Sequence, residues 1–190
     1  MAILNREVRA IQNPALGSVL IWRAASNYQK NHKTASFIPL PLCFLILPIV
    51  FHEETSALIT GTRTASGLRK LTEKFQSAEE SKTDLLLAIG VRAVAMRTLT
   101  WESIRLGLAS NVISINTEDG TLMSLSETPL VSGVPQSIRP LLGSAEKLGT
   151  WFSGLTLYEV GLQMQVTFNG FPDQPNRPMA EKPATENSNR

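Results

Sequence analysis

Apolar and polar positions follow a helical period over most of this chain. In residues 16–28 an apolar residue recurs every three or four positions, which is the spacing of one face of a helix. Asn13 is a favourable N-cap, and Pro14 suits the first helical position. The pattern therefore predicts a helix from about Pro14 to Lys30.

The same period predicts further helices later in the chain. They cover residues 68–75, a segment starting at Leu85, 100–110, 138–152 and 157–164. Thr64 or Ser66 is expected to cap the first of them, Thr100 the third and Thr156 the last. Residues 77–84 are predicted to form a polar linker. In the third helix, Trp101, Ile104 and Leu108 are expected to form the buried stripe.

Two short strands are predicted after these central helices. Residues 112–115 and 121–125 flank the loop "NTEDG", whose Asp-Gly pair is a hairpin signal. Asn111 is expected to end the preceding helix in a left-handed conformation. Two helices separated by a three-residue break and followed by a hairpin form the pattern of a winged helix-turn-helix.

These elements define the predicted fold class. We expect a mainly α (α+β) protein with a winged helix-turn-helix-like core, a β-hairpin wing and additional N- and C-terminal helices. Residues 165–168 are expected to form a terminal strand. Residues 1–169 are expected to form a single globular winged-helix-like domain. Residues 170–190 contain four prolines and almost nothing apolar, so a disordered, Pro-rich C-terminal tail is predicted.

The run "FIPLPLCFLILPIVF" at residues 37–51 carries no charge. A membrane-spanning helix needs about 20 apolar residues, and this run is shorter and contains Pro39, Pro41 and Pro48. We therefore expect no membrane association. Periodicity does not distinguish a buried helix from a buried strand here. Of the two, we favour a short, kinked, buried helix that continues weakly through residues 52–60.

Composition and charge exclude few functions by themselves. The net charge of +2 is too small to indicate nucleic-acid binding, although residues 1–52 are clearly basic. One cysteine, Cys43, lies among aliphatic residues. It is expected to be a small core residue in a reducing, cytoplasmic protein.

Motifs that carry enzyme chemistry are absent from the sequence. It has no P-loop, dinucleotide fingerprint, metal-binding Cys/His array or nucleophile elbow. His52, before Glu53 and Glu54, is better explained as a helix start than as a ligand or an acid/base group. We therefore predict no catalytic residues, no metal site, no cofactor, no small-molecule substrate and no enzymatic activity.

Two groups of basic residues are the candidate anion or nucleic-acid contacts. One surrounds a Ser/Gly-containing loop that leads into a helix N-terminus, where backbone N–H groups can bind an anion. The other is Arg105 on the helix predicted at residues 100–110, which would be the DNA-reading helix of a helix-turn-helix, together with Arg97 just before it. The alternative for the first group is a solvated helix face, and the acidic hairpin tip would repel phosphate. The candidates are Arg63, Ser66, Arg69, Lys70, Lys74, Arg97 and Arg105.

Five segments also carry a family resemblance. In order they are "NREVRAIQNPALGSVLIWR", "PLPLCFLILPIVFHEET", "TRTASGLRKLTEKF", "AMRTLTWESIRLGLASNVISINTEDG" and "RPLLGSAEKLGTWF". Together they resemble the middle component of bacterial three-component ABC systems, relatives of Lamassu-type anti-phage defence. The resemblance covers roughly residues 5–168.

The resemblance implies a non-enzymatic adaptor. Such a subunit would bridge an ABC/SMC-type ATPase and an effector protein in an antiviral or anti-plasmid complex, and would touch DNA, if at all, through that complex. A winged-helix DNA-binding transcriptional regulator is the alternative function. Duplex binding by the purified chain, measured against salt concentration, separates the two.

Overall fold

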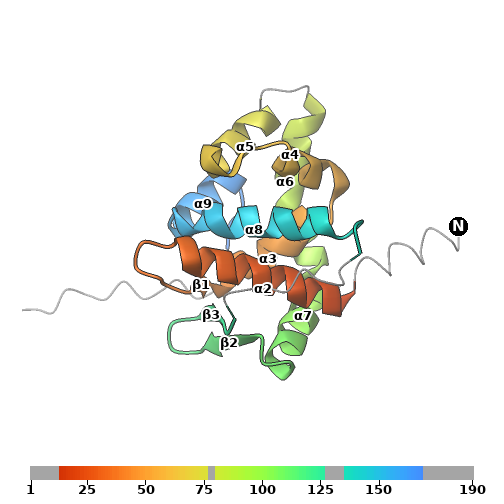
Figure 1. Ribbon diagram of the computed structural model, residues 1–190. Coiled ribbons are helices and arrows are strands. Elements are labelled where there is room, and N and C mark those ends of the chain that lie inside the picture. The colour runs from red at the N-terminus through yellow and green to blue at the C-terminus, as the bar shows by residue number, and fades with distance from the viewer. Residues whose placement is uncertain (1–12, 77–79, 127–134, 169–190) are drawn as a thin grey trace, which may run out of the picture.

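The computed structural model describes residues 13–76, 80–126 and 135–168, and these residues are mainly helical, with a small antiparallel sheet (Figure 1). This confirms the predicted mainly α class. The elements, labelled as in Figure 1, are α2 (Pro14–Asn31), β1 (Ile38–Pro39), α3 (Leu40–Val50), α4 (Glu53–Thr60), a 3₁₀ turn (Thr64–Ser66), α5 (Gly67–Gln76), α6 (Glu80–Ala95), α7 (Arg97–Ala109), β2 (Ile113–Asn116), β3 (Thr121–Ser124), α8 (Arg139–Ser153) and α9 (Leu157–Met164).

Helix α2 lies at the centre of the packing, against α7, α8 and the sheet (Figure 1). It begins as predicted, because the Asn13 side chain accepts a hydrogen bond from the Ala15 N–H at 2.8 Å. The helix approaches α8 closely at Gly149, where an added Cβ would lie 2.1 Å from the carbonyl oxygen of Ala24. Gly17 allows a similar approach of α2 to Ser103 of α7.

The apolar run forms the centre of the core. Every residue of α3 from Pro41 to Val50 is buried, and the helix continues through Pro48. The prediction of a buried helix is therefore confirmed. Its continuation differs, because the chain bends by 101° between α3 and α4. Among the described residues, no single helix is long and apolar enough to cross a membrane, and this bent pair is the one combination that passes on length and composition.

The predicted hairpin is present and gains a third strand. β2 and β3 pair antiparallel, with Asn116 opposite Thr121. Asn111 (φ 53°) has the predicted left-handed conformation, and Gly120 (φ 61°) closes the hairpin loop. The two-residue strand β1 adds to the other edge of β3. Its pairing was not predicted, since a Pro in so short a strand gives no periodic signal.

The boundaries around α6 and α7 differ from those predicted. α6 begins at Glu80 rather than Leu85, because the polar residues assigned to a linker continue the helix. A single residue, Met96, separates α6 from α7, rather than a three-residue break. Thr100 does not cap α7; it is buried within the helix and donates to the Met96 carbonyl oxygen at 3.1 Å. The winged helix-turn-helix assignment is not confirmed.

The C-terminal helices agree with the prediction more closely. α8 buries Leu142, Ala145, Leu148 and Phe152, and α9 begins with a capping box between Thr156 and Glu159. The strand predicted at residues 165–168 is wrong. Gln165 takes a left-handed conformation, and the Val166 N–H bonds back to the Gly161 carbonyl, so these residues terminate α9. The predicted tail at 170–190 lies outside the described residues.

Candidate interaction surfaces

The basic loop after α4 is fixed against α8. The Lys147 ammonium donates to the carbonyl oxygens of Ile59, Thr60 and Thr62 at 2.9–3.2 Å. The Trp151 indole N–H donates to the carbonyl oxygen of Thr64 at 2.7 Å. These bonds satisfy the C-terminal carbonyls of α4, and they leave Arg63 and Ser66 exposed at the surface.

The basic residues of α5 have local partners. Lys74 donates to the carbonyl oxygen of Gly61 at 2.7 Å, which caps the end of α4. Lys70 and Arg69 both pair with Glu73, at 2.9 and 3.5 Å. The hydrogen bond from Lys70 lowers the pKa of the Glu73 carboxyl. The geometry of this group therefore suits both interpretations that the sequence left open, an anion site and a solvated helix face.

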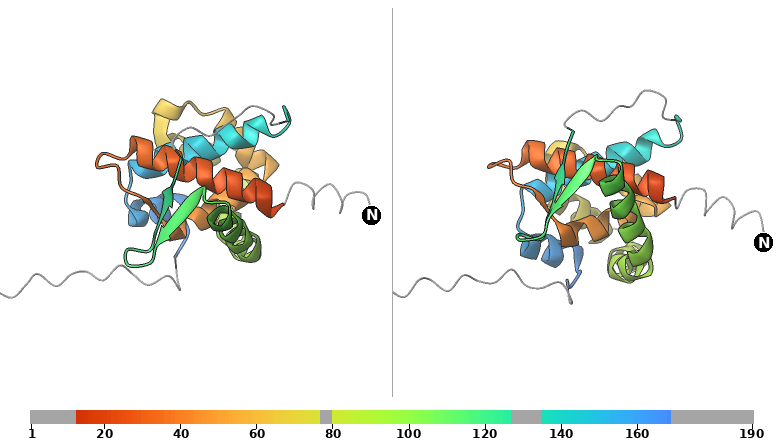
Figure 2. Two further views of the ribbon diagram at one scale, coloured as in Figure 1. Left: turned by 60° about the horizontal axis from the view of Figure 1, so that its bottom comes forward. Right: turned by 90° about the horizontal axis from the view of Figure 1, so that it is seen from below.

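Arg97 and Arg105 are both exposed on α7. α5 and α7 lie at opposite ends of the molecule (Figure 1), so the structure places the two predicted groups of candidate residues far apart. The hairpin that follows α7 is seen in Figure 2, and Glu118 and Asp119 lie in its loop, between β2 and β3. Whether either group contacts an anion or nucleic acid stays a prediction.

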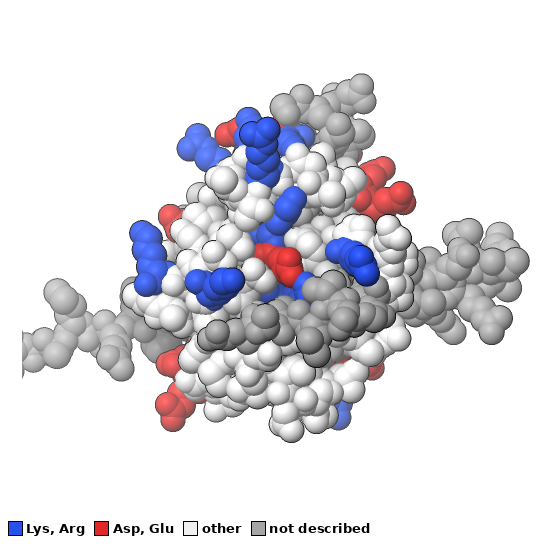
Figure 3. Space-filling model, in the orientation of Figure 1, with Lys and Arg blue, Asp and Glu red and all other residues white. Residues whose placement is uncertain are grey.

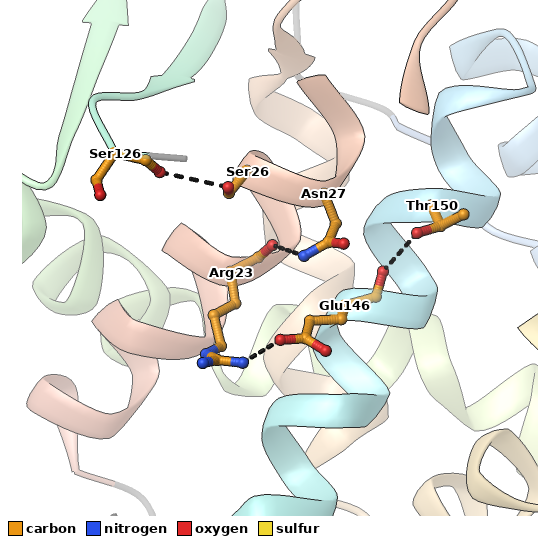
Figure 4. A network of polar contacts seen from close by, with 6 residues as sticks. All are labelled: Arg23, Ser26, Asn27, Ser126, Glu146 and Thr150. Atoms are coloured by element: carbon orange, nitrogen blue, oxygen red, sulfur yellow. Dashed lines mark hydrogen bonds and ion pairs between the residues drawn. The ribbon is translucent and has the colours of Figure 1, made fainter. Parts of the chain in front are cut away.

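A partly buried ion pair, which the sequence did not predict, joins α2 to α8. Arg23, with 4% of its side chain exposed, pairs with Glu146, and Asn27 and Thr150 donate to the backbone carbonyls of these two residues (Figure 4). On the face shown in Figure 3, Lys and Arg side chains surround a small patch of acidic side-chain atoms. The available signal was Arg23, a charged residue inside an otherwise apolar helical pattern.

His52 has the structural role expected of it. Its Nδ1 accepts from the Thr55 N–H at 3.4 Å and lies 3.0 Å from the Thr55 hydroxyl, so it caps α4. Arg92 of α6 donates to the same hydroxyl at 3.2 Å. Burial and the nearby Arg92 charge lower the pKa of His52. Within the described segments, no group of three or more His, Cys, Asp or Glu residues could hold a metal ion.

Cys43 is the expected core residue. Its side chain is fully buried in α3, and burial raises the pKa of the thiol to about 12. A thiol with so high a pKa is almost never ionised at neutral pH, and the thiolate is the nucleophilic form. This environment is typical of a structural cysteine.

Exposed large apolar side chains are concentrated on three helices. Seven such residues belong to α6, α7 and α9, and α6 contacts both of the other helices. Trp101 is among them: it is 36% exposed and packs edge-on against Phe44, so its expected place in the buried stripe was only partly right. Elsewhere in the described part of the chain, only Leu125 is comparable. We call the seven the apolar set: Leu87, Val91, Val94, Trp101, Leu106, Tyr158 and Leu162.

Fold and surface together define a small, mainly helical protein whose exposed apolar side chains gather on α6, α7 and α9. Its sequence identifies the family to which the protein belongs. The chain belongs to the family described as ABC-three component (ABC-3C) system Middle Component 3, which matches residues 1–168. The resemblance to a middle component of three-component ABC systems is therefore confirmed. No curated protein and no solved structure matches the chain.

Proposed function

We propose that this protein is a non-enzymatic, cytoplasmic adaptor that bridges an ABC/SMC-type ATPase and an effector in an anti-phage or anti-plasmid defence complex. Family membership supports the proposal, because a middle component of a three-component system has the other components as partners. The residues that catalysis would most readily use have structural roles: Cys43 is buried in the core and His52 caps a helix.

The observation that carries the proposal is the apolar set. Tyr158 and Leu162 are 77% and 67% exposed and lie one turn apart on α9. Neighbouring exposed apolar side chains, such as this pair on α9, are typical of interaction sites. Aromatic anchors such as Tyr also contribute strongly to protein interfaces. We therefore expect α9 to contact another component of the system.

Co-expression with the other two components tests the proposal. The full chain is purified through an affinity tag, and capture of the ATPase and effector proteins is measured. Tyr158→Glu and Leu162→Glu should each reduce capture strongly, because a charge would be buried at the interface. Leu125→Glu, at a residue 50% exposed beyond the end of β3, is the matched control and should not. Full capture by both α9 variants would refute the assigned contact, and no capture by the unaltered chain would refute the adaptor.

A DNA-binding regulator with a winged helix remains the alternative. Its specific support is that Arg97 and Arg105 are exposed on the helix immediately before the hairpin. The acidic tip, Glu118 and Asp119, argues against it, since phosphate would be repelled there. The regulator predicts duplex binding by the chain alone, with a steep salt dependence that Arg105→Ala makes shallower. The adaptor predicts no such binding.

A further inference from the structure

Helix α6 is apolar on two opposite sides. Its inner side buries Leu86 and Ile89 in the core. Its outer side presents Leu87, Val91 and Val94, which are 53%, 73% and 76% exposed and lie three or four residues apart. We call these three residues the α6 stripe. A helix that is apolar all round is normally covered on all sides, so the outer side of α6 lacks a partner within the described chain.

The outer side of α6 is also free of charge between residues 85 and 95. Arg92, the one charged residue there, is half-buried. It turns inward to the Thr55 hydroxyl and the Leu85 carbonyl oxygen, each at 3.2 Å. An exposed helix face normally carries charged or polar residues, and the absence of charge from this segment favours contact with another apolar surface.

Gly90 lies beside the α6 stripe and has no packing role in the described structure. A Cβ added there would meet nothing within 4 Å, whereas at Gly17 and Gly149 it would lie 2.1 Å from a neighbouring helix. Glycine weakens a helix interior, and at those two positions it permits close helix packing. Gly143 of α8 is equally open, but its neighbours one turn away are Arg139, Pro140, Glu146 and Lys147 rather than apolar residues. Gly90 therefore suits a close crossing by a helix from outside the chain.

The order of residues along α6 is self-complementary when read in opposite directions. About a point between Gly90 and Val91, Leu87 and Val94 lie symmetrically, and so in sequence do Asp84 and Arg97, the first residue of α7. Asp84 and Arg97 are both exposed. In an antiparallel pair of α6 helices, Leu87 of each copy lies at the level of Val94 of the other. Asp84 of each copy then lies toward the end where the other copy's Arg97 begins α7, so opposite charges are brought together at both ends. A two-fold axis repeats each contact twice.

We propose that the α6 stripe is covered by α6 of a second copy of this chain, in an antiparallel pair that crosses at Gly90 and Val91. The inference adds to the proposed function, because it places two copies of the middle component in the complex and leaves Tyr158 and Leu162 of α9 for the other components. The stripe is smaller than a standard protein interface, so we expect a weak dimer whose population depends on protein concentration.

Engineered disulfides test the pairing directly. Val91 lies next to the two-fold axis, so Val91→Cys in the full chain brings two thiols within disulfide distance. Leu87 is the matched control: with a rise of 1.5 Å per residue, its two copies lie about 10 Å apart along the pair, too far to be joined. The native Cys43 is buried and does not interfere. Mild oxidation should give a covalent dimer for Val91→Cys and not for Leu87→Cys. The reverse result, or equal cross-linking of both, would refute the antiparallel pairing.

Sedimentation over a wide range of protein concentration tests the close crossing. Gly90→Leu should raise the dissociation constant of the dimer roughly tenfold or more, because it overfills the crossing. If the association were only non-specific apolar contact, the added leucine would strengthen it. Gly143→Leu, at the other open helical glycine, is the control and should leave the dimer unchanged. Asp84→Arg should weaken the dimer, and Asp84→Arg combined with Arg97→Asp should restore it.

The outcomes also separate this inference from the proposed function. Suppose that the unaltered chain stays monomeric at all concentrations, and that Val91→Glu abolishes its binding to the ATPase or the effector. That result would mean that another component covers the α6 stripe. The dimer would then be wrong and the adaptor would stand. A dimer that binds neither component would support the pairing and refute the adaptor.

Discussion

The close crossing of α2 and α8 allows one stability prediction to be worked out in detail. Gly149→Ala adds a Cβ that would lie 2.1 Å from the Ala24 carbonyl oxygen, where ordinary contact begins at 3.4 Å. The shortfall is 3.4 − 2.1 = 1.3 Å. Because the obstacle is backbone, no side-chain rotation relieves it. The two helices must separate, and the fully buried Leu148 and Phe152 on α8 lose contacts as they do.

The expected cost follows from two opposing effects. Overpacking of this kind typically costs about 1–3 kcal/mol and occasionally more. Replacing a helical glycine by alanine stabilises the helix by up to about 1 kcal/mol, because alanine has the higher helix propensity. Because the added Cβ would clash with a main-chain oxygen, we expect an overpacking cost in the upper part of this range. After the gain in helix propensity, the net loss of folding stability is roughly 1–3 kcal/mol. For a chain of this size that lowers Tm by roughly 2–12 °C.

Gly143→Ala on the same helix is the internal control. Nothing lies within 4 Å of its added Cβ, so only the propensity effect acts, and Tm should rise by about 2–4 °C. Thermal unfolding followed by circular dichroism measures both variants, with urea unfolding as an independent check. If Gly149→Ala unfolds at or above the temperature of the unaltered chain, the close approach of α2 and α8 is not as described. Equal shifts in the two variants would contradict the reasoning in the same way.

Four further outcomes are expected. Leu45→Asp, at a residue 1% exposed in α3, should abolish recovery of folded, soluble protein, whereas Val91→Asp on the outside of α6 should leave the circular dichroism spectrum unchanged. His52 has a lowered pKa in the folded state, so the unfolded chain binds its proton more readily; the urea midpoint should fall as pH drops below about 6.5, and less in His52→Asn. Cys43, with a pKa of about 12 and no exposure, should react with a thiol reagent only after denaturant is added. Lys147→Met should lower Tm by several degrees, since it leaves carbonyl groups at the end of α4 without their charged donor.

Local features explain why much of the helical structure could be predicted. Asn13 before Pro14 and Thr156 before Glu159 are capping patterns whose hydrogen bonds involve residues two or three positions apart. The hairpin loop is equally local, because Asn116 bonds to Glu118 and Asp119 within the turn. Such contacts depend only on neighbouring residues, so a short sequence pattern is enough to identify them.

The boundaries of helices and the exposure of side chains were less predictable where residues distant in the sequence determine them. The start of α6 was placed five residues late, since Glu, Ser, Lys and Thr occur in helices and linkers alike. Trp101 has the periodicity of a buried residue, but how much of it is covered depends on Phe44 and the other side chains that α3 places nearby. The strand β1 exists because β3 is available beside it. None of these partners is near in the sequence.

The sequence by itself determined the helical class, the buried apolar run, the hairpin and the family resemblance. These follow from side-chain periodicity, turn chemistry and capping, which act over a few residues. Only the tertiary structure placed the two groups of basic residues at opposite ends, paired Arg23 with Glu146 and left the apolar set exposed on α6, α7 and α9. These relations depend on how distant helices pack, because side-chain volumes and close approaches such as those at Gly17 and Gly149 set which surfaces meet and which stay open.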